Sequence, residues 1–356
     1  MPTQTIQLDR LQHQLGEHLQ RTRFANQSCH LELLAHGEAN VIFRLNHTQL
    51  VRVAVNTPNQ RFAGKIERVT QFEQSILQYL QGTGIGHQLQ DAKPEPTADF
   101  PYTYLITNYL EGIALNYSRS HLQQCAETLA QLHRLPLEAG YELDRIRSQV
   151  PVIDQPLTRF YQEAKDYAQP YLTAPDAEPE IIQMLEAVLH QAEQQLNAES
   201  LLTDYPHCCL VHSDHTCENW VINDRQAYLI DWEWAELGSP AGDLGHFLSP
   251  VTVRRCQGYH LPASDRAFFL HHYYEALEDA DLADRIQHHF TAFGVFPAVR
   301  SLCWTAGYWI TANRWYADGN SPNGAERMAR LQQSRQQFPE LWQEIMNWLN
   351  DPEPQA

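Results

Sequence analysis

Three polar side chains in the second half of the chain have the types and spacing that phosphoryl transfer from ATP requires. Asp214 is followed five positions later by Asn219, and Asp231 stands at the end of a short apolar run. A carboxylate such as Asp214 can accept or orient the proton of an attacking hydroxyl group. An amide oxygen and a second carboxylate can hold Mg²⁺ against the phosphates. We therefore expect Asp214 to be catalytic, and Asn219 and Asp231 to be metal ligands.

The segment between the two expected metal ligands explains how they could share one ion. Residues 220–230 read as strand, turn and strand, with Asn223-Asp224 in the turn. A hairpin of this length would bring Asn219 and Asp231 to the same end of a small sheet. The pattern therefore predicts a shared metal site, with ATP and Mg²⁺ as cofactors.

The wider motif resembles the catalytic and metal loops of the aminoglycoside phosphotransferase and choline kinase family, relatives of the protein kinases. The resemblance is carried by His212-x-Asp214-x-x-x-x-Asn219 and Asp231-Trp232-Glu233. It implies that His212 orients the catalytic loop. The run at residues 237–244 is similar to a stretch of that family in which the Asp, here Asp243, is structural and braces this loop.

The resemblance covers residues 20–345 and implies an α+β, bilobal protein-kinase-like fold. Residues 1–110 would form a small nucleotide-binding lobe with an antiparallel sheet. Residues 111–350 would form a mostly helical lobe with the catalytic and metal loops and the acceptor site. Three short runs in the first lobe have the composition of strands and are separated by turn-like residues: 31–34, 41–45 and 50–55.

The expected phosphate-binding groups lie in this first lobe. Gly37 begins a run that resembles the loop over the phosphates, although a single glycine also fits an ordinary hairpin turn. Arg52 alternates with buried-type valines, and a cation on the inner face of a sheet needs an anionic partner. Kinases have Lys here, whereas Arg offers bidentate geometry. The expected partner is Glu73 on a predicted helix, with Glu67 as the competitor and a solvated edge-strand Arg52 as the alternative.

The adenine site is expected at the end of a later strand. Residues 102–110 predict that strand, closed by Glu111-Gly112. Its place along the chain resembles the hinge of the kinases. The resemblance implies that backbone groups from Asn108 to Leu110 bind adenine.

Helical patterns dominate the remainder of the chain. Leucines at helical spacing predict an opening helix over residues 8–19, and a helix over 122–133 is expected to end on a structural His133. A helix over 157–169 is expected to end at Pro170, because proline cannot continue the hydrogen-bond ladder. Further helices are expected over 179–196 and from Ser264.

An aromatic concentration on a late helix is the candidate acceptor site. Trp304, Tyr308 and Trp315 can share one helix face. They can pack in the core or form a wall for an ammonium group, and choline kinases are similar in placing aromatics in this part of the chain. The net charge of −18 suits a cationic acceptor and argues against nucleic acid as a partner, although diffuse surface acidity also explains it.

Composition indicates a cytoplasmic protein. The first residues lack the pattern of a signal peptide, and no run approaches the ~18 apolar residues of a membrane span. The seven cysteines, an odd number in a long chain, fit reduced thiols. Cysteines and histidines crowd into residues 207–217 and suggest zinc, but the expected strand there sends alternate side chains to opposite faces. No pattern indicates an oligomeric state.

The sequence therefore predicts an ATP-dependent kinase that phosphorylates a hydroxyl group of an amino alcohol, an aminoglycoside or a similar small molecule. The rival prediction is a catalytically inactive, kinase-like nucleotide-binding module, against which the intact Asp214, Asn219 and Asp231 argue. Two departures from the family pattern stand out. Ser213 replaces a frequent Gly, and Trp232-Glu233 replaces the Phe-Gly of protein kinases, which leaves Glu233 open as a further metal ligand.

Overall fold

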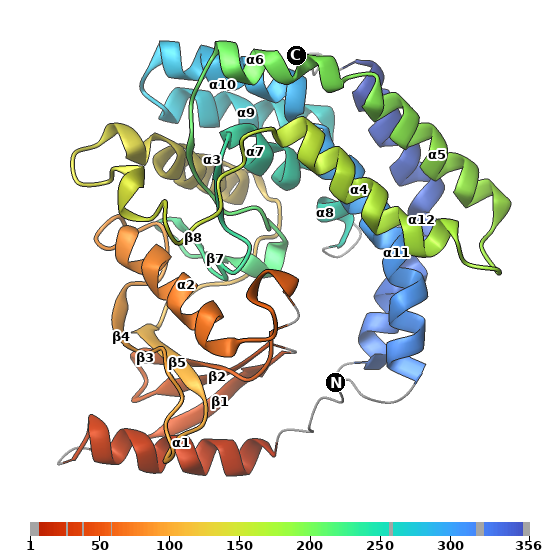
Figure 1. Cartoon of the computed structure of the whole chain (residues 1–356). Helices are drawn as coiled ribbons and strands as arrows, with labels where there is room; N and C mark the ends of the chain where they lie inside the picture. The colour runs from red at the N-terminus through yellow and green to blue at the C-terminus, as the bar shows by residue number, and fades with distance from the viewer. Residues whose placement is uncertain are drawn as a thin grey trace. The chain divides into compact units, whose positions relative to one another are not determined.

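The computed structural model of the chain describes residues 7–25, 28–37, 39–57, 59–255, 259–317 and 324–351. The chain divides into two compact units (Figure 1). The sheet unit holds the described residues up to Glu111 together with Tyr228–Glu233. The helical unit holds Gly112–Ala227 and the described residues from Trp234 onward.

The sheet unit is built on five antiparallel strands in the order β1-β2-β3-β5-β4. Three of them confirm the strands expected from the sequence near residues 31, 41 and 50. The strand β4 was not expected, because its residues carry charges without apolar alternation. The five strands are β1 (Leu31–His36), β2 (Asn40–Leu45), β3 (Gln49–Ala54), β4 (Leu89–Lys93) and β5 (Thr103–Asn108).

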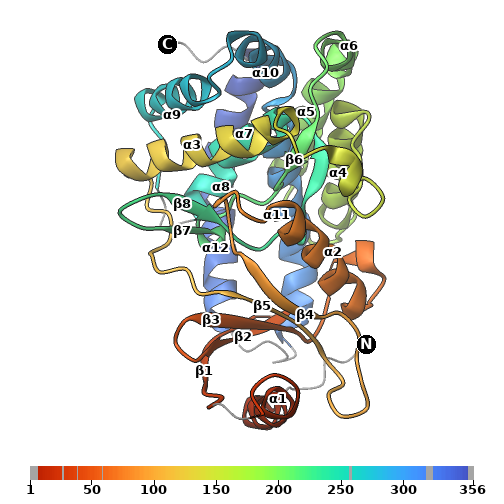
Figure 2. The same ribbon diagram turned by 90° about the vertical axis from the view of Figure 1, so that its left-hand side faces the viewer.

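The two faces of this sheet are covered by different helices (Figure 2). Leucines of α1 (Leu8–Thr22) are buried in one cluster with Val51 and Val53, which point to the same side of β3. Because side chains alternate along a strand, Arg52 points to the opposite face. On that face α2 (Ile66–Tyr79) packs against β3, β4 and β5. The alternation of β3 therefore puts Arg52 under the helix that carries Glu73.

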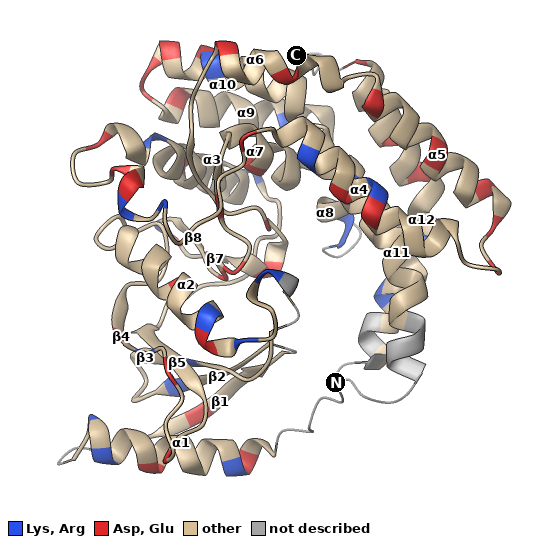
Figure 3. Ribbon diagram, in the orientation of Figure 1, with Lys and Arg blue, Asp and Glu red and all other residues tan. Residues whose placement is uncertain are grey.

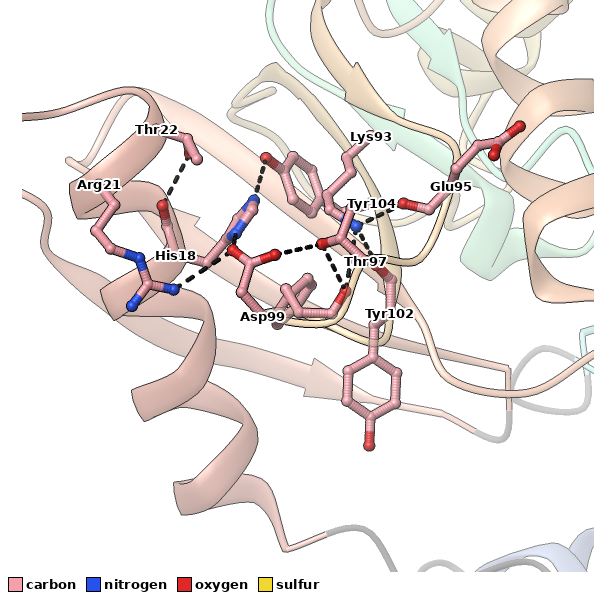
Figure 4. A network of polar contacts seen from close by, with 10 residues as sticks. His18, Arg21, Thr22, Lys93, Glu95, Thr97, Asp99, Tyr102 and Tyr104 are labelled. Carbon is pink, nitrogen blue, oxygen red and sulfur yellow. Dashed lines mark hydrogen bonds and ion pairs between the residues drawn. The ribbon is translucent and has the colours of Figure 1, made fainter.

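A polar network fixes α1 to the loop between β4 and β5 (Figure 4). The Nδ1 atom of His18 lies 2.9 Å from Asp99 Oδ2, and Arg21 approaches the same oxygen at 3.4 Å. Thr97 donates its hydroxyl to Asp99 Oδ1 at 2.6 Å. The hydrogen bonds from Thr97 and His18 hold the pKa of Asp99 below its usual range. The His18 ring also stacks on Phe100 with its centroid 5.1 Å away.

The helical unit contains two short sheet pairs among many helices. β6 (Cys209–Val211) pairs with β9 (Glu236–Gly238). β7 (Trp220–Ile222) pairs with β8 (Ala227–Leu229), which confirms the hairpin, and the boundary between the two units falls within β8. The main helices are α3 (Arg119–Arg134), α4 (Pro156–Leu172), α5 (Pro179–Glu193), α6 (Glu199–Asp204), α7 (Pro240–Leu248), α8 (Pro250–Arg255), α9 (Ala263–Ala276), α10 (Ala280–Phe293), α11 (Phe296–Ala317) and α12 (Gly324–Asn350).

The expectation that Pro170 ends its helix is wrong. α4 continues through Pro170 to Leu172. A proline removes the bond that its own nitrogen would donate to the carbonyl oxygen four residues earlier, and α4 ends two residues after this loss. The same segment packs closely on α11, because a Cβ atom on Gly307 would lie 1.9 Å from the Tyr167 carbonyl oxygen. Glycine at this position therefore permits the close approach of α4 and α11.

Charged residues are spread over the helices of the helical unit. Acidic side chains occur on α4, α5 and α10, and along α4 they alternate with basic ones (Figure 3). Within the described ranges, no helix combines the length and apolarity that spanning a bilayer demands. The chain is an α+β protein with an antiparallel sheet in one unit and a mostly helical second unit, as the sequence predicted.

Candidate functional site

The loop between β6 and β7 carries the expected catalytic residues. It ends in a short 3₁₀ turn, Cys217–Asn219, which places Asn219 directly before β7. The Asn219 amide nitrogen donates to the Asp214 backbone oxygen and to Asp214 Oδ2, both at 2.9 Å. Since the nitrogen is used in this way, the amide oxygen of Asn219 is the atom that can bind a cation. The structure thus brings Asp214 and Asn219 together.

A buried carboxylate on α7 holds this loop from several directions. Asp243 accepts hydrogen bonds from the backbone N–H groups of His212 and Ser213, both at 2.8 Å. The Nε2 atoms of His215 and His133 lie 2.9 and 3.1 Å from its two oxygens. Burial would raise the pKa of Asp243, but His215 and His133 hold it well below its usual range. These contacts fit the bracing role expected for Asp243 and the structural role expected for His133.

His212 contacts the loop that it precedes. Its side chain is fully buried, and its Nδ1 atom lies 3.3 Å from the backbone N–H of Asp214, which donates to it. An imidazole nitrogen that accepts a hydrogen bond carries no proton, so this contact defines the tautomer. His212 therefore helps to fix the backbone at Asp214.

Two non-glycine residues at the expected site adopt left-handed backbone conformations. The φ angles are +67° at Ser213 and +68° at Asp231. Side chains other than glycine occupy this region at a cost, and such conformations concentrate at functional sites. The conformation at Ser213 explains in physical terms why glycine suits this position.

Arg52 in the sheet unit joins two carboxylates. Its Nη1 atom lies 2.8 Å from Glu73 Oε1, and its Nη2 atom lies 2.6 Å from Asp231 Oδ1. The structure thus selects Glu73 over Glu67 as the partner. Since β3 lies between β2 and β5, the alternative of a solvated edge-strand arginine is wrong. The link to Asp231, 179 residues away, had no signal in the sequence.

The charges around Arg52 shift its pKa and that of its partner. Burial acts to lower the pKa of the Arg52 guanidinium, but Asp231, Glu73 and Glu233 together raise it above its ordinary value. Burial acts to raise the pKa of Glu73, and the neighbouring charge of Arg52 acts to lower it. Arg52 therefore stays a cation whose charge several carboxylates share.

The turn at Gly37 is linked to Arg52 through Asn40. The Gly37 N–H donates to the Asn40 backbone oxygen at 2.9 Å and closes the turn between β1 and β2. With its amide oxygen turned toward the guanidinium, Asn40 accepts from Arg52 Nε at 3.1 Å and from Nη2 at 2.7 Å. This orientation is the one that pairs an acceptor with donors. The expected phosphate loop and the expected phosphate-binding cation are thus connected.

The expected hinge is tied to the start of β4. The Asn108 N–H donates to the Gln88 backbone oxygen at 3.2 Å, and the Asn108 carbonyl oxygen lies 3.0 Å from His87 Nδ1. Burial lowers the pKa of His87 to about 4, so its neutral ring donates to this carbonyl. In the described part of the chain, no backbone oxygen accepts a hydrogen bond from the N–H of Leu110. Sequence reasoning missed His87, because a lone histidine in a loop carries no pattern.

The aromatic residues of α11 divide into two environments. The rings of Trp304 and Tyr308 stack with centroids 4.6 Å apart, and Trp304 is 38% exposed. Trp309 is 2% exposed and belongs to the core. The side chain of Trp315 lies outside the described residues. Trp304 is therefore exposed, whereas Tyr308 is half-buried.

One cysteine departs from the expectation of reduced thiols. Cys217, at the start of the 3₁₀ turn before Asn219, is disulfide-bonded. Counting cysteines in the sequence does not reveal which of them lie close enough in space to pair. Five others are free thiols: Cys29, Cys125, Cys208, Cys209 and Cys303.

Several solved structures have a similar fold. They include a choline/ethanolamine kinase family protein from Mesorhizobium loti, with 16% identity, a TM-score of 0.53 and coverage of 90% of this chain and 99% of that chain. A putative aminoglycoside phosphotransferase from Ralstonia eutropha has 15% identity, a TM-score of 0.59 and coverage of 94% and 98%. The streptomycin–ATP complex of APH(2'')-IIa has 17% identity, a TM-score of 0.51 and coverage of 91% and 97%. At these identities the likeness shows the fold.

The family assignment rests on the sequence itself. No protein with a curated description matches the chain. A model of the phosphotransferase enzyme family matches residues 30–289, which include the sheet, the catalytic loop and Asp243. This match spans well over half of the chain, so the chain belongs to the phosphotransferase enzyme family.

Proposed function

We propose that this chain transfers the γ-phosphoryl group of ATP to a hydroxyl group of a small molecule. The observation that carries the proposal is the pairing of Asp214 with Asn219 on a loop braced by the buried Asp243. A module that only binds nucleotide has no need for a catalytic carboxylate held in this way. Burying the charge of Asp243 costs desolvation free energy. A catalytic loop that must keep one geometry explains why the chain bears this cost.

Asp214 is the residue that accepts or orients the proton of the acceptor hydroxyl. Asn219 and Asp231 are the residues that hold Mg²⁺, because amide and carboxylate oxygens are the ligands this ion prefers. Their chemistry fits the ion: the Asn219 amide presents oxygen, and the Asp231 side chain remains 40% exposed. When bound, Mg²⁺ neutralises charge on the phosphates. His212 keeps the Asp214 backbone in place.

Arg52 and Glu73 orient the phosphates. Glu73 is 5% exposed and holds one end of the guanidinium, while Asp231 and Asn40 hold the other, so the cation has a fixed direction. The turn at Gly37, linked to Arg52 through Asn40, lies over the phosphates. The segment from Asn108 to Leu110 contacts the adenine, with the Leu110 N–H as a donor.

The acceptor is a small hydroxylated molecule that carries a positive charge, such as an amino alcohol or an aminoglycoside. The stacked Trp304 and Tyr308 offer an aromatic face, which attracts an ammonium group by about 0.5–2 kcal/mol. The net charge of −18 favours the approach of a cation. A relative in fold, APH(2'')-IIa, was solved with streptomycin and ATP, which agrees with this class of acceptor.

Calorimetry with ATP in the presence and absence of Mg²⁺ tests the metal assignment. Asp231→Ala should remove the dependence of ATP affinity on Mg²⁺, because a metal ligand is lost. Since position 231 has a left-handed backbone, Asp231→Asn is the second variant, as Asn tolerates that conformation. Asp224→Ala, at an exposed position in the same hairpin, is the matched control and should behave as the parent. Equal Mg²⁺-ATP affinity in all four proteins would contradict the proposal.

A further inference from the structure

The peptide group between Asn108 and Tyr109 is held from both sides. Its N–H, which belongs to Tyr109, donates to the Thr48 backbone oxygen at 2.9 Å. Its carbonyl oxygen, which belongs to Asn108, lies 3.0 Å from His87 Nδ1 and accepts from it. The N–H and C=O of one trans peptide point in opposite directions. The two contacts together therefore keep this peptide from turning over.

The backbone at His87 is itself anchored within the sheet unit. Gly86 forms a parallel bridge with Leu229, and a Cβ atom on Gly86 would lie 2.5 Å from the Leu229 carbonyl oxygen. Only glycine permits this close approach. On the other side of His87, the Gln88 N–H donates to Asn108 Oδ1 at 2.7 Å. The donor that reaches the Asn108 carbonyl is thus carried by a segment with neighbours on both sides.

The held peptide gives the expected base site a defined order of hydrogen-bonding groups. Backbone groups along an extended strand point alternately to its two edges. Because the Tyr109 N–H points toward Thr48, the Asn108 carbonyl and the Leu110 N–H lie on the opposite edge. A carbonyl oxygen has two lone pairs, of which His87 takes one. This edge therefore offers a base one acceptor, followed by one donor.

We propose that His87 is a positioning residue that makes the nucleotide site select a 6-amino purine over a 6-oxo purine. The inference rests on the proposed function, which places the base beside residues 108–110. Adenine presents a donor at its 6-amino group and an acceptor at N1. These groups are the complement of the Asn108 carbonyl and the Leu110 N–H.

A 6-oxo purine has the reverse order, an oxygen at position 6 and an N–H at N1. Against the held peptide, it would set oxygen against the Asn108 oxygen and N–H against the Leu110 N–H. Turning the peptide over would present the Tyr109 N–H to the purine oxygen and relieve the first conflict. The contact from His87 is one of the two restraints that oppose this turn.

Titration calorimetry of the full chain with the Mg²⁺ complexes of ATP and inosine triphosphate (ITP) measures the selectivity. The two nucleotides differ only in the group at position 6 and the proton at N1, so their affinity ratio reports on this edge of the base. His87→Leu removes the donor, whereas His87→Asn keeps an N–H donor near the position of Nδ1. His13→Leu, at a 76% exposed histidine of the same unit, is the matched control. Thermal unfolding checks that each variant is folded.

We expect the parent, His13→Leu and His87→Asn to bind ATP at least about tenfold more tightly than ITP, and His87→Leu to discriminate less than about threefold. An affinity ratio in His87→Leu equal to that of the parent would overturn the proposal. An equal loss of the ratio in His87→Asn would assign the effect to packing of the ring and also overturn it. If His87→Leu does not fold, the parent decides, because ITP binding as tight as ATP binding would overturn the selectivity.

These outcomes separate the role of His87 from the proposed function. If the parent phosphorylates an acceptor from ATP while the ratio is unchanged in His87→Leu, only the role of His87 is overturned. If the ratios are as expected and no acceptor is phosphorylated, the role of His87 stands and phosphoryl transfer is overturned. A parent that binds neither nucleotide would overturn both.

Discussion

Replacing Asp243 by Asn tests how much the buried carboxylate contributes to the catalytic loop. Oδ1 of Asp243 accepts from the Ser213 N–H and lies 2.9 Å from His215 Nε2. Oδ2 accepts from the His212 N–H and from His133 Nε2. In the variant, an NH₂ group would replace one oxygen and face two donors. Each lost hydrogen bond to the charged acceptor costs about 1.5–3 kcal/mol, so the loss is roughly 3–6 kcal/mol.

Thermal unfolding followed by circular dichroism measures this loss. For a domain of about 150–250 residues, each kcal/mol corresponds to about 2–4 °C, so the melting temperature should fall by about 6–24 °C. Asp284→Asn is the matched control, because Asp284 is 67% exposed and pairs with His288 at 3.7 Å. A melting temperature of Asp243→Asn within about 2 °C of the control would refute the bracing argument.

The same variant carries a pH signature. The pKa of Asp243 is lower in the folded chain than its unfolded value of about 3.9. The stabilisation by this carboxylate is therefore fully present above about pH 4 and is lost as the pH falls further. The difference in melting temperature between the parent and Asp243→Asn should be constant near neutral pH and shrink in acid. If the difference in melting temperature grew in acid, the lowered pKa of Asp243 would be contradicted.

Three further substitutions test single contacts. Ser213→Gly should raise the melting temperature by about 1–4 °C, because glycine accepts a φ of +67° without strain, and a lowered temperature would contradict this. Arg52→Lys should lower the free energy of unfolding by about 1–3 kcal/mol in urea titrations, because one ammonium group cannot bind Glu73, Asp231 and Asn40 together. An unchanged free energy of unfolding would contradict this. Trp304→Leu should raise the acceptor KM about 2–30-fold without changing the KM for ATP, whereas Trp309→Leu should lower the melting temperature; the reverse pattern would assign Trp304 to the core.

Elements with a strong local pattern could be predicted from the sequence. The leucine spacing of α1 and the valines that flank Arg52 in β3 reported which faces are buried. The strand β4 was missed, because Leu89–Lys93 has no apolar alternation and is recognisable only by its pairing with β5. Pro170 was read as a helix end because proline usually ends or kinks a helix, whereas α4 continues for two residues beyond it.

Contacts within the candidate site are also of two kinds: those along one loop, which the sequence predicted, and those between distant segments, which it did not. Asp214 and Asn219 were found because the chemistry fixes their residue types and their spacing along one loop. The bond from Arg52 to Asp231 and the bond from His87 to the Asn108 carbonyl depend on how distant segments meet in space. No local pattern reports such contacts.

Transfer of the γ-phosphoryl group tests the central claim most directly. The parent chain and Asp214→Asn are incubated with Mg²⁺-ATP and a panel of small hydroxylated and aminated metabolites, and the phosphorylated products are quantified. We predict that the parent phosphorylates at least one cationic acceptor, and that Asp214→Asn binds ATP as the parent does but transfers none. If the parent phosphorylates no acceptor and the two proteins behave identically in every assay, the chain is a nucleotide-binding module and the account is contradicted.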